Sequence, residues 1–240
     1  MDNTQRLDKY LSGNGYVSRR GVEGFLLDNE VLINGKKATE AGKRINPEKD
    51  IILINGKKTV KPSFVYFLLN KPKGTVSTSS DEKGRGTVTN LVKTKERVYP
   101  VGRLDQDSRG LILLTNDGDL TFRLTHPKFH IPKTYYVTVA GSVPIDKLVR
   151  LRKGIRLEEG VTSPAEVTIL KSTPNDTTLR FILHEGWKRQ IRRMCEAVKL
   201  KVIDLQRVSI GPLQLGNLGE GKHRNLEPKE LTKLKEASFK

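Results

Sequence analysis

Apolar residues near the start of the chain recur at helical spacing. Leu7 and Leu11 stand four positions apart, and this period predicts a short helix over residues 4–12 with Thr4 as its N-cap. A Gly-Asn-Gly run then breaks the pattern, and Ser18 is positioned to cap a second segment with the same apolar spacing. The sequence therefore predicts two consecutive helices.

Two short apolar runs follow these helices, at residues 31–33 and 51–54, and each ends in an Asn-Gly dipeptide. Asn-Gly accepts the positive φ angles of tight hairpin turns, so both runs are expected to be strands. The order helix, helix, hairpin predicts a small domain over residues 1–60. A polar, basic stretch at 57–63 that contains a proline is the expected linker.

Strand patterns dominate the remaining residues, 61–240, which are expected to form a second domain. The expected strands are at 64–69, 97–101, 110–115, 134–140, 162–170, 178–184 and 202–210. The expected helices are at 118–125, 144–152, 187–198 and 227–236. Because short turns join many of the strands, the pattern predicts an α+β domain with a mostly antiparallel sheet.

Composition indicates the class of partner. The formal net charge is +17 and the isoelectric point is about 9.9, which favours a polyanion and above all a nucleic acid. The single cysteine excludes a disulfide framework and a cysteine-based metal site. No apolar run approaches the roughly 20 residues of a membrane helix, and the N-terminus lacks a signal-peptide core. We therefore expect a cytoplasmic protein with no membrane contact.

Basic residues of the first domain fall where an anion would be expected to bind. Lys9, Arg19 and Arg20 lie at or near the predicted helix starts, where the helix dipole disfavours a cation, and Lys36 lies on a hairpin tip. Helix N-termini beside such cations make phosphate sites, so these residues are candidate RNA contacts. The alternative is solvated surface charge, which is more plausible for Lys36 than for the arginines.

A charged segment bounded by Gly102 and Gly110 is the first candidate for chemistry. It contains Asp105 between Arg103 and Arg109, and it leads directly into an apolar strand that can hold it rigidly. A nearby arginine favours the ionised form of a carboxylate, as a nucleophile or base requires. The alternative is a surface ion pair. An EF-hand is excluded, because arginine occupies the fifth position of that loop and strand patterns flank it.

A basic helix is the second candidate. Its apolar positions, which include Ile191 and Cys195, form one face, so the cysteine is expected in the core. Its other faces carry Arg189, Arg192, Arg193 and one lysine. These charges repel one another unless anions approach. The helix therefore predicts binding of phosphate, or pairing with a distant carboxylate such as that of Asp105.

Aromatic and histidine pairs are weaker signals. Strand alternation sends Tyr135 and Tyr136 to opposite faces, so one ring can serve as a platform for an unstacked base, although both can equally be structural. His126 and His130 stand four positions apart, but prolines at 127 and 132 argue against the helix that would align them as metal ligands. We expect no metal site.

These segments together resemble the ribosomal RNA pseudouridine synthases of the RsuA/RluB/RluF type. Residues 6–37 look like an S4 RNA-binding domain. The catalytic motif of that family resembles Tyr99–Asp105 with the following Leu-Ile-Leu-Leu-Thr-Asn-Asp-Gly-Asp-Leu run, and its other motifs resemble Asn70–Gly74, Lys133–Tyr135 and Glu185–Met194 in the same order. The resemblance covers nearly the whole chain. It implies a catalytic domain with a mixed, mostly antiparallel sheet and a central cleft.

The resemblance also implies roles for individual residues. Asp105 would be the nucleophile, and Arg192 would pair with it. Tyr135 would stack on the target base and Ile191 would pack against that base. Arg103 would help to fill the space that the extruded nucleotide leaves. With Arg189 and Arg193 and the basic residues of the first domain, these complete the predicted site.

The implied reaction converts a uridine of structured RNA to pseudouridine after the base leaves its stack. Ribosomal RNA is the expected substrate, with 23S favoured over 16S and transfer RNA possible, and we expect a monomer that needs no cofactor. The sequence leaves open whether Asp105 attacks C6 of the base or C1′ of the ribose. Two rivals also stay open: an S4 protein that binds RNA without catalysis, and a nucleoside glycosidase that uses Asp105 and Asp107.

Overall fold

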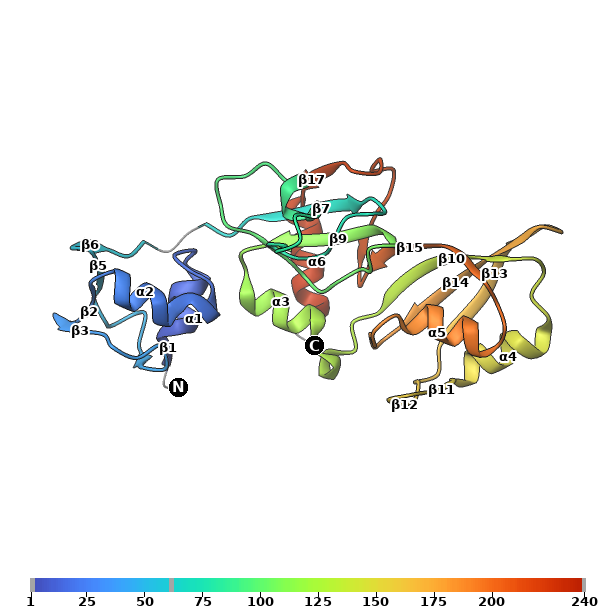
Figure 1. Ribbon diagram of the computed structural model, residues 1–240, viewed down its shortest axis with the longest axis horizontal. Helices are drawn as coiled ribbons and strands as arrows, with labels where there is room; N and C mark the ends of the chain where they lie inside the picture. Colours follow the sequence, from blue (N-terminus) through green and yellow to red (C-terminus); the bar gives the residue numbers. More distant parts are fainter. Residues whose placement is uncertain (1–2, 61–62, 239–240) are drawn as a thin grey trace. The chain divides into compact units, whose positions relative to one another are not determined.

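The computed structural model describes residues 3–60 and 63–238, and the chain divides into two units. The first takes the described residues up to Val65 together with Asn116–Gly118, and the second takes Tyr66–Thr115 and the described residues from Asp119 onward. The predicted linker over 57–63 contains residues 61 and 62, which lie outside the described residues. Each unit is described below by itself (Figure 1).

The first unit contains two helices and two small sheets. In chain order its elements are β1 Gln5–Arg6, α1 Leu7–Gly13, the 3-10 turn η1 Arg19–Gly21, α2 Val22–Asp28, β2 Val31–Ile33, β3 Lys36–Lys37, β4 Arg44–Ile45, β5 Ile52–Ile54 and β6 Lys57–Lys58. The larger sheet has the antiparallel order β3-β2-β5-β6. Apolar residues of α1, α2 and one face of this sheet form a separate core.

The predicted helices are present, but the N-cap of the first was wrong. Residues 5 and 6 pair with β4, so α1 begins at Leu7, and Arg6 holds the N-cap position without a side-chain cap. The Thr4 hydroxyl accepts a hydrogen bond from Arg44 instead (3.1 Å). A pairing with residues 40 positions later has overridden the local signal. Ser18 does act as a cap, because its hydroxyl accepts from the Gly21 N–H at the start of the second helical segment.

The second unit is built on a large mixed sheet. Its strands are β7 Tyr66–Lys71, β8 Tyr99–Pro100, β9 Arg109–Thr115, β10 Lys133–Ala140, β11 Arg156–Leu157, β12 Gly160–Val161, β13 Glu166–Ser172, β14 Asp176–Leu183, β15 Val202–Ile210, β16 Leu213–Gln214 and β17 His223–Asn225. Its helical segments are η2 Thr89–Leu91, α3 Gly118–Thr125, η3 Pro127–Phe129, α4 Ile145–Lys153, α5 Gln190–Ala197 and α6 Pro228–Ser238.

The sheet runs in the order β13-β14-β10-β15-β9-β7-β17, and β8 and β16 add to it at the sides. Every pairing is antiparallel except that of β15 with β9. The α+β class and the mixed, mostly antiparallel sheet are therefore confirmed. The sequence patterns did not reveal β11, β12, β16 and β17, since two or three residues are too few to show alternation.

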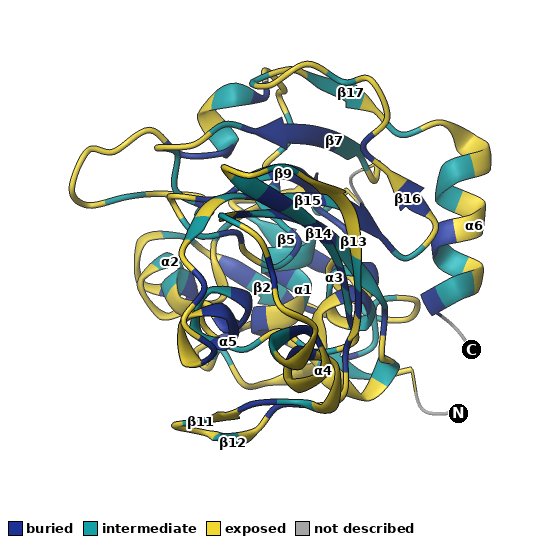
Figure 2. Ribbon diagram, turned by 90° about the vertical axis from the view of Figure 1, so that its right-hand side faces the viewer, coloured by how far each residue is buried: buried dark blue, intermediate teal, exposed yellow. Residues whose placement is uncertain are grey.

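Two hydrophobic cores lie along this sheet. In the first, α4 and α5 pack on the strands β13, β14 and β10, an arrangement that Figure 1 shows and Figure 2 marks as buried. In the second, α3 and α6 pack near β7 and β9. Strand β15 contributes to both cores. The parallel pair β15–β9 therefore joins two halves of the sheet, and the Asp105 segment leads into this junction.

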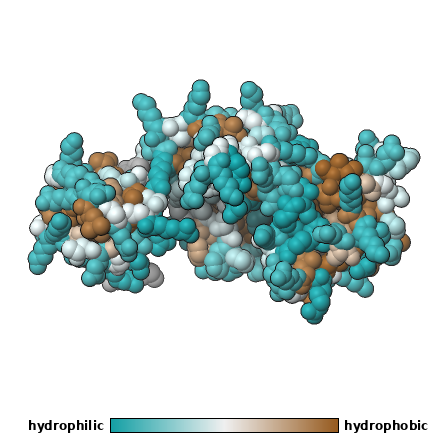
Figure 3. All heavy atoms as spheres, in the orientation of Figure 1, coloured by the Kyte–Doolittle hydropathy of each residue, from teal (hydrophilic) through white to brown (hydrophobic). Residues whose placement is uncertain are grey.

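The surface is largely polar. Hydrophilic side chains cover most of the face shown in Figure 3, with smaller hydrophobic patches among them. No described helix combines the length and the apolar character needed to cross a membrane.

Candidate active site

The loop before β9 is fixed at both of its sides by the cores. Val101 belongs to the core with α3 and α6, and Leu104 belongs to the core with α4 and α5. Gly102 between them takes a φ of 72°, a region that glycine enters without strain. The chain therefore crosses from one core to the other within three residues and presents Asp105 at the crossing.

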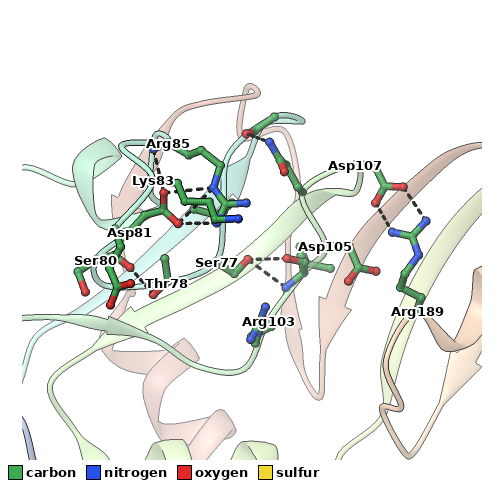
Figure 4. A pocket seen from close by; sticks show the side chains of 15 residues that line it. Ser77, Thr78, Ser80, Asp81, Lys83, Arg85, Arg103, Asp105, Asp107 and Arg189 are labelled. Atoms are coloured by element: carbon green, nitrogen blue, oxygen red, sulfur yellow. Dashed lines mark hydrogen bonds and ion pairs between the residues drawn. The ribbon is translucent and has the colours of Figure 1, made fainter. Parts of the chain in front are cut away.

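Backbone contacts at alternate positions then hold the loop. The Ser77 hydroxyl donates to the Leu104 carbonyl (2.7 Å) and accepts from the Leu104 N–H (3.1 Å), while the Gly74 N–H donates to the Gln106 carbonyl (2.8 Å). The Lys71 ammonium donates to the Ser108 carbonyl (2.7 Å). Because residues 104, 106 and 108 are held through their backbones, the side chains of the intervening aspartates are free to project (Figure 4).

Asp105 lines two neighbouring cavities of about 840 Å³ and 720 Å³. The second of these, which we call the base cavity, is also lined by Tyr135, Ile191 and Arg192. These residues come from three separate parts of the chain: the loop before β9, strand β10 and helix α5. The structure thus brings together the three predicted catalytic residues. Arg103 and Arg189 line the same cavity.

The arginines of α5 contact Asp107 in place of Asp105. Arg189 donates to both carboxylate oxygens of Asp107 (3.0 and 2.9 Å), and the Arg192 Nε lies 3.3 Å from one of them. Burial opposes ionisation of Asp107, but the hydrogen bond from Arg189 and the charge of Arg192 outweigh it, so its pKa lies below the ordinary value. Within the described part of the chain, no ion pair joins Arg192 to Asp105, in contrast to the expected pairing.

Tyr135 occupies the position that the alternation of β10 assigns to the interior. Its side chain is nine-tenths buried and lines the base cavity, whereas Tyr136 is 40% exposed on the opposite face. Ile191 is buried in the core beneath the same cavity. An aromatic ring and an aliphatic side chain on one cavity give the two apolar surfaces that a planar base can contact.

Comparison with known proteins decides what this arrangement belongs to. The family model for RNA pseudouridylate synthase matches residues 65–197, and that for the S4 domain matches residues 5–52. The chain is 43% identical to ribosomal large subunit pseudouridine synthase B of Bacillus subtilis (strain 168), over 96% of each chain. It is 39% identical to an uncharacterized RNA pseudouridine synthase of Aquifex aeolicus (strain VF5), over 95% of this chain and 93% of the other.

The chain belongs to the RNA pseudouridylate synthase family. A crystal structure of a pseudouridylate synthase agrees, with a TM-score of 0.70 and 34% identity over 95% of this chain and 99% of that chain. The expected family, the S4 domain and the enzyme class of pseudouridine synthase are therefore confirmed.

Other predicted residues of this synthase lie outside the base cavity. Arg193 forms a double hydrogen bond with Glu159 (2.7 and 2.8 Å), so the cations of α5 are less isolated than the sequence suggested. Arg109 is likewise paired with Asp204 and turned away from Asp105. Cys195 is buried as expected, and burial raises the pKa of its thiol to about 12.

The predicted contacts of the S4 domain are all exposed. Arg19 has a protein partner, since its guanidinium lies 3.4 Å from the Asp8 carboxylate. Arg20 and Lys36 form no ion pair with any described residue. An RNA contact by Lys9, Arg19, Arg20 or Lys36 stays a prediction.

Two buried cations of the synthase were given no role by sequence reasoning. Lys71 is fully buried at the end of β7, and burial lowers its pKa to about 8, although Asp107 and Asp105 oppose this effect. Arg207 is 3% exposed in β15, and its Nε donates to the Leu111 carbonyl (2.8 Å). A charged residue at the buried phase of an alternating strand was the available signal, and the pattern over 202–210 contained it at position 207.

Gly110 explains how Arg207 comes so close to the loop. Its φ is 109°, and a Cβ at this position would collide with the Arg207 backbone. The parallel pairing of Arg207 with Gly110 therefore depends on glycine. Any larger residue at position 110 would push apart the two strands on which the loop is mounted.

Proposed function

We propose that this synthase converts a specific uridine of large-subunit ribosomal RNA to pseudouridine, with Asp105 as the nucleophile acting on a base turned out of its stack. The observation that carries the proposal is the contrast between the two aspartates of the loop. Asp107 accepts hydrogen bonds from Arg189, whereas the Asp105 carboxylate has no hydrogen-bond partner among the described residues and lines the base cavity. A carboxylate without such a partner is the one available to attack.

The chemistry balances without an added reactant. The N1–C1′ bond breaks and the uracil turns, after which a C5–C1′ bond forms, the proton leaves C5, and N1 gains a proton. Asp105 either bonds to C1′ as N1 departs or adds to C6 of the ring, and both routes release the carboxylate at the end. Tyr135 and Ile191 would hold the ring while it turns, because both line the cavity that contains Asp105.

The substrate class rests on two supports. The relative from Bacillus subtilis is a ribosomal large subunit enzyme by name, and the S4 model matches residues 5–52. A net charge of +17 suits a large polyanion. We therefore propose large-subunit ahead of small-subunit ribosomal RNA, with a monomer in the cytoplasm as the acting form.

The nucleoside glycosidase rival is weakened by the state of Asp107. That mechanism needs a second carboxyl group that carries a proton as the acid. The two arginines hold the pKa of Asp107 below its ordinary value, which keeps it ionised. Asp107 is therefore unsuited to the acid role, and isomerisation without loss of the base is the better account.

The test uses transcripts of large- and small-subunit ribosomal RNA that carry tritium at uridine C5. The proposal expects tritium release from the large-subunit transcript alone, at one mapped position, with no free uracil. Release from the small-subunit transcript alone would overturn the substrate. Free uracil with an abasic site would establish the glycosidase.

A further inference from the structure

A third cavity, of about 150 Å³, lies next to the base cavity. We call it the side cavity. Gly102, Arg103, Tyr135, Glu185 and Gly186 line both spaces, so the two adjoin. The side cavity has about five times the volume that one water molecule occupies in the liquid, about 30 Å³. It is therefore large enough for a small group of atoms.

Arg207 supplies an unsatisfied cation to this cavity. Its Nε donates to the Leu111 carbonyl at 2.8 Å, and one terminal nitrogen lies 3.4 Å from the Arg103 carbonyl. The other terminal nitrogen is buried and has no hydrogen-bond partner. A buried guanidinium normally uses its donors, because an unmade hydrogen bond in the interior costs free energy. The free donor therefore indicates a ligand.

Lys133 supplies a second cation to the same cavity. It is two residues before Tyr135 on β10, so both side chains lie on one face of the strand, and Tyr135 is the cross-strand partner of Arg207. The Lys133 ammonium donates to the Ile131 carbonyl (3.0 Å). Burial, with the charge of Arg207, lowers its pKa to about 8. It is thus still a cation at neutral pH.

Neither cation is neutralised by the protein. Among the described residues, no carboxylate lies within 4.0 Å of Lys133 or Arg207, although the neighbouring Arg189 and Arg193 are both paired with carboxylates. Glu185 also lines the side cavity, but its oxygens accept hydrogen bonds from Ser163 and Gln190. The cavity therefore holds two positive charges and no free negative one.

We propose that the side cavity is an anion subsite, in which Lys133 and Arg207 bind a backbone phosphate next to the uridine that enters the base cavity. This rests on the proposed function, because it assumes an RNA substrate. The phosphate of an extruded nucleotide lies beside its ribose, and the side cavity adjoins the cavity of Asp105 and Tyr135. The two cations would fix the ribose, so that C1′ keeps its place while the base turns.

The first experiment asks for the anion alone. Crystals of the full chain are soaked at pH 7 with tungstate, a heavy tetrahedral oxyanion that stands in for phosphate. The proposal expects an anomalous peak in the side cavity within hydrogen-bond distance of Arg207 and Lys133. Peaks at surface lysines only, or an ordered water in the cavity in place of tungstate, would overturn it.

The second experiment asks for the phosphate of RNA. Lys133→Met removes the charge and keeps the length of the side chain, Lys133→Arg keeps the charge, and Lys153→Met removes an exposed lysine of α4 as the matched control. Each phosphate contact with single-stranded RNA adds about 0.7 to the slope of log affinity against log salt. Lys133→Met should lower this slope by about that amount and slow single-turnover isomerisation at least tenfold, whereas the other two variants should resemble the wild type.

The outcomes separate the two proposals. If the wild type forms no pseudouridine on ribosomal RNA but tungstate occupies the side cavity, the proposed function fails and the anion subsite stands. If the wild type is active and Lys133→Met leaves both the salt slope and the single-turnover rate unchanged, the subsite fails and the proposed function stands. Arg207 is left intact in these tests, because its other nitrogens contact the loop that carries Asp105.

Discussion

The S4 domain and the cavities of the catalytic domain are both rich in cations, but the two regions hold them in different ways. In the S4 domain the basic residues at the hairpin tips, such as Lys36 and Lys57, are exposed and belong to strands of only two residues. In the catalytic domain Arg189 is paired with Asp107, and Arg207 is buried against backbone carbonyls. One region offers movable charge to solvent, and the other fixes charge in place.

This difference indicates a division of labour. Exposed lysines attract a polyanion from a distance and release counterions on contact, which adds affinity but little orientation. Fixed arginines contribute little to capture, because carboxylates already neutralise several of them. They act instead on the position of the loop and of the reacting groups. Changes in the cavities should therefore alter the chemical step, and changes in the S4 domain should alter binding.

The largest expected effect comes from Asp105→Asn. The replacement keeps the volume of the side chain and removes only the charge and the nucleophilic oxygen, so the fold and RNA binding should survive. Loss of a covalent nucleophile typically removes roughly 5 kcal/mol or more of transition-state stabilisation, which is several powers of ten in rate. Tritium release and a gel-shift assay on one preparation measure both quantities.

Asp107→Asn is the matched control for this change, since it alters a carboxylate of the same loop that Arg189 and Arg192 already occupy. We expect the rate to fall by about tenfold, because hydrogen bonds to a charged group are weakened while the nucleophile is kept. If Asp105→Asn kept even a tenth of the wild-type turnover while Asp107→Asn kept none, the roles of the two aspartates would have to be exchanged.

Arg192→Ala should have the next largest effect. The Arg192 side chain is 15% exposed and contacts Asp107 through its carboxylate and its carbonyl oxygen, which fixes the loop from the side of α5. Loss of one charge-assisted hydrogen bond removes about 2–3 kcal/mol, or roughly 100-fold in turnover if the loop position matters only for chemistry. RNA affinity should change little. Arg192→Lys should recover part of the rate, because it keeps the charge but loses the planar fork.

Arg189→Ala serves as the comparison for Arg192→Ala. Arg189 contacts the same carboxylate, but its side chain is 42% exposed, and exposed ion pairs contribute little. A decrease in turnover of less than about tenfold is expected. Equal decreases in the two variants would show that Asp107 itself, and not the buried contact of Arg192, fixes the loop.

The order of the motifs and most of the elements could be predicted because they depend on local spacing. The helical period around Ile191 and the alternation around Tyr135 are properties of neighbouring residues, and the structure places both side chains as these patterns require. The two Asn-Gly turns are local as well, with Asn34 and Asn55 at positive φ. Such signals survive folding unless a distant segment competes for the same backbone groups.

Partners that are distant in the sequence could not be predicted. The sequence did not reveal that Arg192 would contact Asp107 and not Asp105, because two residues of loop determine which carboxylate faces α5. Nor could it show that Lys71 and Arg207 lie close to the loop from β7 and β15, since this depends on the order of strands in the sheet. The identities of the reacting residues were local information, but the charges around them were not.

Deletion of residues 1–60 should have a moderate effect, on binding alone. The core of the S4 domain uses residues between 7 and 52, and the cores of the catalytic domain use residues between 66 and 234, so the remainder should still fold. RNA affinity should fall by about tenfold or more, and the salt slope should decrease by about 0.7 for each phosphate that the S4 domain binds. The single-turnover rate at saturating RNA should stay within a few-fold of the wild type.

Circular dichroism and thermal unfolding of the truncated protein provide the control for folding. Equal salt slopes with and without residues 1–60 would mean that the S4 domain does not bind phosphates. A saturated rate that fell as far as it does in Arg192→Ala would mean that the domain acts on the chemistry, and the division of labour would be wrong.

The smallest expected effect, and the sharpest within the S4 domain, compares Lys36→Ala with Lys37→Ala. Both lysines are exposed in β3, but strand alternation sends them to opposite faces of the sheet. Lys36 is paired with Ile33, whose side chain packs in the core with α1 and α2, so it lies on the face that carries the helices and their basic residues. Lys37 is paired with Leu32 on the other face. If RNA contacts the helix-bearing face, Lys36→Ala should lower the salt slope by about 0.7 and Lys37→Ala should leave it unchanged. Neither change should alter turnover at saturating RNA. The reverse result would assign the RNA to the open face of the sheet and would remove Lys36 from the predicted site.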